Sequence, residues 1–396
     1  KLWLTTFLIA VTILLGSFLH PTVSQAEITK SFGAPIELGT PVTQISLNDA
    51  TFGEYDGVDY MYGTENGSPA VFNVVNLDDN KLVKSFPMSN TRDSWTHVID
   101  QHGNVFLTAT GKLFKYSPET VELEDLGKHM SGAKESYAIT LDEEGNVYGG
   151  TYPGAQFYKY DVSTGEYINY GSMVEGQDYV RSLAYHDGYV YAGIGPDGSL
   201  VRFNTETEEI TEVEIPNRPN YYDVENLATV YDLNTVDNYL FVHLSENVLL
   251  IYDLVNERWL DETFDNYRSL NVAENAYNDK AYFVANGNIY SFDIKTEAFE
   301  DTGIDYGPRV RGAGWVTVEK DSDFPGQSMA LQAWEGEITL VNFETNSKKV
   351  LPPAVEGQPT EIQALEKGPD GNLYISGFRS ARGAKFDPET QDSEQF

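Results

Sequence analysis

Six short segments of the sequence combine aromatic, arginine and carboxylate side chains, and each precedes a stretch with strand character. Aromatic rings offer flat apolar faces, and the guanidinium fork of arginine can bind a carboxylate or a pair of hydroxyls. Together these residue types suit the binding of a sugar chain. The segments are Arg92–His97, Glu135–Tyr137, Asp178–Arg181, Tyr221–Asp223, Asn266–Arg268 and Arg309–Trp315.

If the six segments occupy equal positions in successive repeats of a ring, their side chains gather around one channel mouth. The competing interpretation is that the repeated tyrosines and arginines only pack and pair between neighbouring repeats. We take nine residues as candidate ligand-binding residues and assign no catalytic residue. They are Trp95, His97, Tyr137, Tyr179, Arg181, Tyr222, Arg268, Arg309 and Arg311.

The same residue types also fit β-elimination of a uronate polymer. Arg181, Arg309 or Arg311 would neutralise the uronate carboxylate. Tyr137, Tyr179 or His97 would then serve as base and acid. The formal charge of −35 disfavours a polyanionic substrate unless the channel mouth is locally positive.

The sequence offers no metal or cofactor motif. Residues 27–396 contain five histidines, and none of them forms an H-E-x-x-H pair. Acidic turns such as Asp142–Asn146 lack the spacing of a calcium loop, and neither a G-x-S-x-G elbow nor a phosphate-binding loop is present. We therefore expect neither a metal nor a cofactor.

The elements that must position the candidate residues are short strands in a repeat. In Gly145–Gly165 two strands alternate with period 2, a Pro153-Gly154 turn joins them, and Asp161-Val-Ser-Thr-Gly165 closes the hairpin. A polar residue closes the third strand of every unit, and these residues recur about every 44 positions on average. They are Asn76, Ser117, Asp161, Asn204, Asp253, Asp293, Asn342 and Asp387.

A period in the forties with four short strands per unit is typical of a propeller blade. The units Tyr160–Tyr167, Phe203–Glu209 and Phe386–Thr390 resemble the strand, D-x-x-T-G, strand element of secreted bacterial propeller repeats, a group related to the quinoprotein-like and WD40-like propellers. The Trp-Asp dipeptide of WD40 repeats and the vicinal cysteines of some quinoproteins are absent. The resemblance implies the fold, and neither a cofactor nor an activity follows from it.

We thus predict an all-β fold, a β-propeller of four-stranded antiparallel blades with eight repeat units. Ile36–Val42 resembles the last strand of a unit, so this N-terminal strand is expected to close the ring by completing the blade that begins near Ile362. The alternative is a seven-bladed ring in a longer, C-terminally truncated protein, because Gln391–Phe396 looks like the start of that blade's own fourth strand.

Residues 1–26 have the pattern of a secretory signal peptide, a basic start and an apolar run followed by Ser24 and Ala26 before the cleavage point. An uncleaved N-terminal anchor is the alternative. Zero cysteines exclude a disulfide framework, and the acidic surface makes nucleic-acid binding unfavourable. We expect residues 27–396 to form a single propeller domain that is secreted and monomeric and does not contact the membrane after cleavage.

The function that these patterns favour is binding of an extracellular ligand, foremost a polysaccharide, by the blade-joining loops. Two alternatives remain open, the polysaccharide lyase and a scaffold that binds a surface protein. A locally basic pocket with tyrosine or histidine beside arginine would favour the lyase. A flat acidic face would favour the scaffold.

Overall fold

The computed structural model describes residues 34, 37, 39–265, 272–318, 321–378 and 382–396, and Thr40–Phe396 form one compact unit. The signal-peptide prediction for residues 1–26 and the candidate Arg268 lie outside the described residues. The regular secondary structure of the described chain is β-strand apart from one 3₁₀ turn, η1 (Val224–Asn226). No helix among these residues is long and apolar enough to cross a membrane.

The predicted hairpin of Gly145–Gly165 is confirmed. Its strands are β11 (Val147–Tyr152) and β12 (Gln156–Asp161), paired with Tyr148 opposite Lys159. At the closing turn the Asp161 carboxylate accepts the backbone N–H groups of Ser163 and Thr164, and Gly165 has φ +73°. Aspartate and glycine therefore stand where the turn needs an acceptor and a left-handed residue.

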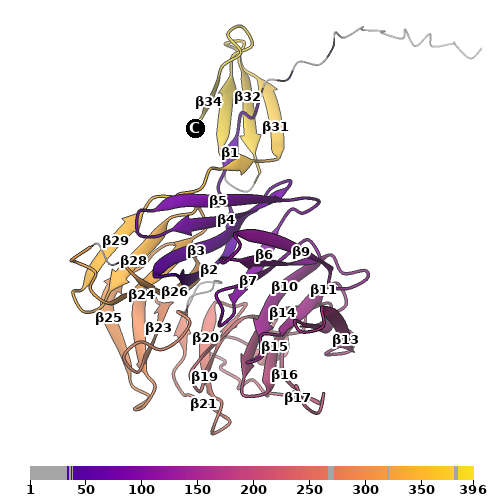
Figure 1. Ribbon diagram of the computed structural model, residues 1–396, viewed down its shortest axis with the longest axis vertical. Helices are drawn as coiled ribbons and strands as arrows, with labels where there is room; N and C mark the ends of the chain where they lie inside the picture. Colours follow the sequence, from indigo (N-terminus) through magenta and orange to yellow (C-terminus); the bar gives the residue numbers. More distant parts are fainter. Residues whose placement is uncertain (1–33, 35–36, 38, 266–271, 319–320, 379–381) are drawn as a thin grey trace, which may run out of the picture. The chain divides into compact units, whose positions relative to one another are not determined.

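Seven sheets follow one another along the chain, and consecutive strands pair antiparallel within each (Figure 1). Sheet 1 contains β2 (Leu47–Tyr55), β3 (Val58–Glu65), β4 (Ala70–Asn76) and β5 (Lys81–Met88). Sheet 2 contains β6 (Ser94–Ile99), β7 (Val105–Ala109), β8 (Lys112–Ser117) and β9 (Glu122–Lys128). In sheet 3, β10 (Glu135–Leu141) and β13 (Glu166–Ser172) flank the hairpin described above. Sheet 4 contains β14 (Tyr179–His186), β15 (Tyr189–Gly195), β16 (Ser199–Asn204) and β17 (Ile210–Glu212).

The later sheets vary more. Sheet 5 contains β18 (Val230–Val236), β19 (Tyr239–Leu244) and β20 (Val248–Asp253), and β20 pairs with both β21 (Arg258–Trp259) and β22 (Phe264–Asp265). Sheet 6 contains β23 (Lys280–Ala285), β24 (Asn288–Asp293) and β25 (Phe299–Asp305), with Val272 bridged to Phe283. Sheet 7 contains β26 (Val310–Thr317), β27 (Gln327–Ala333), β28 (Ile338–Asn342) and β29 (Ser347–Leu351).

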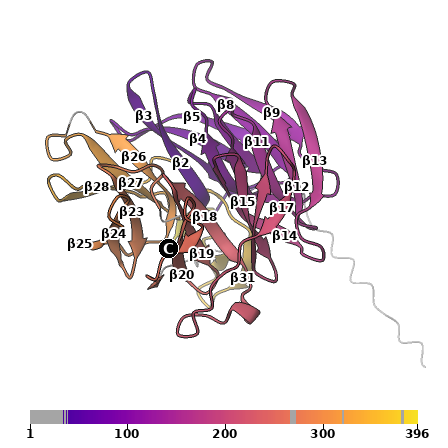
Figure 2. The same ribbon diagram turned by 90° about the horizontal axis from the view of Figure 1, so that it is seen from below.

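The core is divided into apolar clusters, each of which joins one sheet to the next. A further cluster joins sheet 7 to sheet 1, with Phe52 beside Val316 and Ala330. At this contact a Cβ on Gly312 would lie 1.9 Å from the carbonyl oxygen of Ala50, so only glycine lets the two first strands approach so closely. Figure 2 shows β2 and β18, two first strands, nearer the middle of the arrangement than β13 and β25.

The predicted equivalence of the second strands is also confirmed. Tyr148, Tyr191, Phe241 and Tyr374 each pair, at the same register, with the regular stretch that follows a bulge in the first strand. The first three are buried, at 2%, 3% and 0% exposed, while Tyr374 is 38% exposed. The last unit of the repeat therefore has the strand register of the other units, but its second-strand aromatic residue is not buried.

That last unit is sheet 8, built from β31 (Ile362–Lys367), β32 (Leu373–Gly377), β33 (Gly383–Phe386) and β34 (Ser393–Gln395). The prediction that Ile36–Val42 supplies its fourth strand was wrong. β34 occupies that position, and the described residues of 36–42 form no strand. The chain instead pairs β1 (Thr43–Gln44) with β30 (Gln358–Pro359), just before sheet 8.

Candidate functional site

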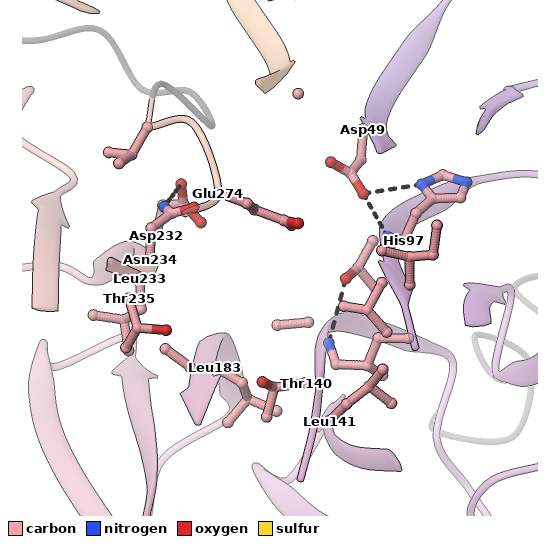
Figure 3. Close-up of a pocket in the computed structure, with 18 of the residues that line it drawn as sticks. Asp49, His97, Thr140, Leu141, Leu183, Asp232, Leu233, Asn234, Thr235 and Glu274 are labelled. Atoms are coloured by element: carbon pink, nitrogen blue, oxygen red, sulfur yellow. Dashed lines mark hydrogen bonds and ion pairs between the residues drawn. The ribbon is translucent and has the colours of Figure 1, made fainter. Parts of the chain in front are cut away.

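A cavity of about 510 Å³ is lined by the first strands of sheets 1 to 5 and 7, together with residues 272–275 of sheet 6 (Figure 3). Segments that are far apart in sequence therefore converge on one space. This convergence follows from the repeat, because equal positions of successive units contribute equal positions around the cavity.

A register irregularity near the start of each first strand sets the side chains that enter the cavity. In sheets 3, 4 and 5 a single residue is bulged, respectively Tyr137, Arg181 and Tyr231. Sheets 1, 2 and 7 shift at the equivalent place, where Asn48, Trp95 and Arg311 lie. A bulge turns extra side chains away from the ladder, so sheets 3, 4 and 5 each present one non-ladder residue to the cavity and sheets 1, 2 and 7 each present two.

Arg181 lies among aromatic rings contributed by three other sheets. Its guanidinium carbon is 4.0 Å from the ring centre of Tyr231, 5.1 Å from that of Tyr137 and 5.6 Å from that of Trp95. These distances are those of cation–π contacts. The three rings hold the guanidinium in place.

Tyr231 lies between two arginines. Burial by itself would raise the pKa of its phenol, but the charges and hydrogen bonds of Arg181 and Arg311 outweigh burial and lower that pKa. A phenol held in this way ionises more readily than an ordinary tyrosine. The two arginines thus favour the phenolate form of Tyr231.

A second cavity of about 700 Å³ adjoins the first, and the two share Asn48, Trp95, Tyr231 and Arg311. The rest of its lining is Pro308, Arg309, Ala333, Trp334, Glu335 and Glu337. The Arg311 guanidinium lies 4.9 Å from the ring centre of Trp334. Arg311 is only 8% exposed, and its Nε has no hydrogen-bond partner among the described residues. We call the lining of this second cavity, with Arg181 and Tyr137, the arginine mouth.

Four carboxylates line the first cavity, those of Asp49, Asp100, Asp232 and Glu274. Burial raises the pKa of Asp232 to about 7, against an opposing effect of Asn234 and Arg181. Its carboxylate accepts a 3.0 Å hydrogen bond from Asn234. Glu274 is exposed by its accessible surface and lines the cavity, where desolvation and the charge of Asp49 raise its pKa to about 7. Both groups can hold a proton near neutral pH.

His97 is oriented by Asp49 and lies away from the centre of the cavity (Figure 3). Its Nδ1 is 2.9 Å from the Asp49 carboxylate, and its Nε2 is 2.8 Å from the hydroxyl of Thr64. Thr64, His97 and Asp49 are the residue types of a nucleophile, a base and an acid, but Thr64 is fully buried and lines neither cavity. We interpret it as a structural network that joins sheets 1 and 2.

The structure brings together five of the nine predicted site residues in the arginine mouth, namely Trp95, Tyr137, Arg181, Arg309 and Arg311. Tyr179 lies behind Tyr137, with ring centres 6.2 Å apart, and lines neither cavity. Tyr222 belongs to the apolar core between sheets 4 and 5, and its hydroxyl donates to the carbonyl of Pro216. Tyr222 was chosen as a site residue because the first strand of sheet 5 was expected to begin earlier in the sequence than it does.

Sequence reasoning missed Asn48, Tyr231 and Trp334. A signal for Tyr231 was present, because Val180-Arg-Ser-Leu183 and Val230-Tyr-Asp-Leu233 share their apolar spacing. The long connection between sheets 4 and 5 obscured it by offering a second tyrosine pair at Tyr221 and Tyr222.

Comparisons with known proteins concern the fold alone. No family model and no curated protein matches the sequence. One solved structure, "Crystal structure of the computationally designed Ika8 protein: crystal packing No.1 in P63", is similar, with a TM-score of 0.52 and 14% identity, over 85% of this chain and 96% of that one. Within the described ranges, no group of three or more histidine and acidic side chains is arranged to hold a metal ion.

Proposed function

We propose that sheets 1 to 7 form a closed, seven-bladed β-propeller whose central channel is the first cavity. The apolar cluster between sheets 7 and 1 supports this, as does the lining of one cavity by all seven units. Sheet 8 contributes no residue to the seven apolar clusters of the described chain, which favours seven blades over the eight expected from the repeat count.

We propose that this propeller is exported and that its arginine mouth binds a carboxylated polysaccharide. The observation that carries the proposal is the state of the three arginines. No ion pair between described residues involves Arg181, Arg309 or Arg311, although acidic residues outnumber basic ones by 61 to 26. The buried charge of Arg311 is costly unless an anion compensates it, and no ion pair of the described residues joins it to Glu335 or Glu337 of the same cavity.

The remaining features of the mouth fit a sugar chain. The buried Nε of Arg311 is a hydrogen-bond donor without an acceptor among the described residues, and a carboxylate can accept two parallel hydrogen bonds from a guanidinium. Trp95, Tyr137 and Trp334 offer the flat apolar surfaces on which sugar rings stack. A neutral glycan would stack on the rings but would bring no negative charge to the arginines. The flat acidic face that would favour a protein scaffold is not what the mouth presents.

Calorimetric titration with uronate oligosaccharides tests this function. Binding is expected for oligosaccharides with free carboxylates, and the same oligosaccharides with carboxyls reduced to alcohols serve as the matched control. Salt should weaken the binding, because exposed charges are screened. Equal affinity for the acidic and the reduced oligosaccharides would contradict a carboxylate site, and absence of binding by every uronate polymer would overturn it.

Tyr231 favours a second candidate, β-elimination of the bound polymer. Arg181 and Arg311 would neutralise the uronate carboxylate, which makes the adjacent C–H more acidic, and the Tyr231 phenolate would take that proton. The C–H electron pair would then form a C=C bond as the glycosidic C–O bond breaks. A protonated Asp232 or Glu274 is placed in the same cavity to supply the proton that the leaving oxygen needs.

The elimination product contains a C=C bond conjugated to the carboxylate and absorbs in the ultraviolet. Tyr231→Phe should abolish the appearance of this absorbance and preserve binding of the intact oligosaccharide. If the parent protein binds the polymer and no absorbance develops, the protein is a binding protein and the elimination is refuted.

A further inference from the structure

All six residues of β31 in sheet 8 are exposed, on both faces of the sheet. Along β32, Tyr374 and Ser376 are exposed while Leu373 and Ile375 are half-buried. The more covered side includes Ala384 and Phe386, both buried, with Val42 against Gly377, although Leu365 on this side is 58% exposed. The uncovered side is defined by Ala364, Glu366, Tyr374, Ser376, Lys385 and Glu394, and we call it the Tyr374 face.

The repeat itself shows what covers such a face. Tyr148 and Tyr191 occupy the same register position in sheets 3 and 4, and each is packed in the apolar cluster that joins its sheet to the following one. Phe241 is packed in the same way between sheets 5 and 6. The occupant that suits Tyr374 is therefore another blade-type sheet. The equivalent faces of sheets 3, 4 and 5 are covered within the chain, and sheet 8 of a second copy offers a surface of the same kind.

We propose that two copies of this chain associate by packing their Tyr374 faces against each other. The charges on the face are self-complementary. One cross-strand row reads Glu366, Tyr374, Lys385, since Tyr374 pairs with Glu366 on one side and with Lys385 on the other. A twofold axis running along β32 places Glu366 of each copy over Lys385 of the other, with the two tyrosines between them.

The dimensions permit these contacts. Packed sheets lie about 10 Å apart, and glutamate and lysine side chains together span that separation. Within one copy Lys385 is only loosely paired, 4.0 Å from Glu394, so its ammonium can turn to a new partner. The association is isologous, in which each copy uses the same residues. It replaces the monomer expected from the sequence and does not depend on the ligand of the arginine mouth.

Sedimentation of the whole protein over a range of concentrations tests the proposal by charge reversal. Glu366→Lys or Lys385→Glu alone should weaken dimerisation about tenfold, since each reversal makes two symmetric contacts repulsive. The double variant E366K/K385E should restore the parent dimerisation constant. Glu300→Lys, a reversal on sheet 6, is the matched control and should leave dimerisation unchanged.

Tyr374→Ala supplies an independent variant, with thermal melting to show that the other sheets remain folded. It should also produce a monomer. A parent protein that sediments as a monomer at every concentration overturns the proposal. So does a dimer that survives both single reversals, or one that the double reversal fails to restore.

Discussion

Replacing Arg181 by alanine separates a ligand-binding arginine from a structural one. In the folded protein Arg181 contacts the rings of Tyr231, Tyr137 and Trp95 and lies near Arg311. An arginine that served only to hold neighbouring sheets together would be paired with a carboxylate, and no ion pair of the described residues gives Arg181 one.

The contacts set the size of the effect on stability. Each cation–π contact contributes about 0.5–1 kcal/mol at an accessible site, so three contribute about 1.5–3 kcal/mol. Removing Arg181 also relieves repulsion. Burial first, and then the charges of Arg309 and Arg181, lower the pKa of Arg311. The two effects oppose each other, and we expect the free energy of unfolding to fall by less than about 2 kcal/mol.

Ligand binding should suffer more than folding. A charged hydrogen bond to a carboxylate contributes about 1.5–3 kcal/mol, which corresponds to a loss of roughly 10- to 150-fold in affinity. The assay is calorimetry with a uronate oligosaccharide, accompanied by chemical unfolding of the same preparations.

Arg202→Ala is the control. The Arg202 guanidinium donates to Glu257 at 2.5 Å and to Thr211 at 3.1 Å, and it lies over Tyr189 on sheet 4. Its loss should reduce stability modestly, because the pair is partly exposed, and should leave ligand affinity unchanged. If Arg181→Ala instead destabilised the fold by several kcal/mol and bound the oligosaccharide as tightly as the parent, the arginine mouth would be a packing feature and our reasoning would be refuted.

Three further predictions concern ionisation. Tyr231→Phe should remove a phenolate signal from the early part of an alkaline absorbance titration, since Arg181 and Arg311 lower that pKa, and an unchanged curve would argue against it. Burial lowers the pKa of His129 from 6.5 to about 4, so the neutral imidazole contributes to stability above pH 6.5 and this contribution is lost as the pH falls towards 4. The free energy of unfolding of the parent should therefore fall by up to about 3 kcal/mol over that window, and that of His129→Phe should not. Burial raises the pKa of Asp232 from 3.8 to about 7, so the stability of the parent falls as the pH rises between these values. Asp232→Asn should therefore be more stable than the parent by up to about 4 kcal/mol at pH 8 and equally stable below pH 4. A difference in stability that stays constant with pH would contradict the burial of this carboxyl.

The local structure was determined by the sequence. Strand alternation around Val147 and Tyr158 and the Asp161–Gly165 turn depend on side-chain direction and backbone conformation within a few residues. The repeat of these hairpins then required a series of equivalent sheets, and arginines and aromatic residues at equal positions had to converge. Trp95, Tyr137, Arg181, Arg309 and Arg311 were found in this way.

Only the tertiary structure decided the number of sheets in the core and the chemistry of the mouth. Sheet 7 meets sheet 1 at Gly312 and Ala50, a contact between residues far apart in sequence that no local pattern encodes. Tyr222 and Tyr231 have the same residue type, yet the first is packed in the core and the second lies between two arginines. Burial and neighbouring charges, which are set by packing, gave these two tyrosines opposite roles.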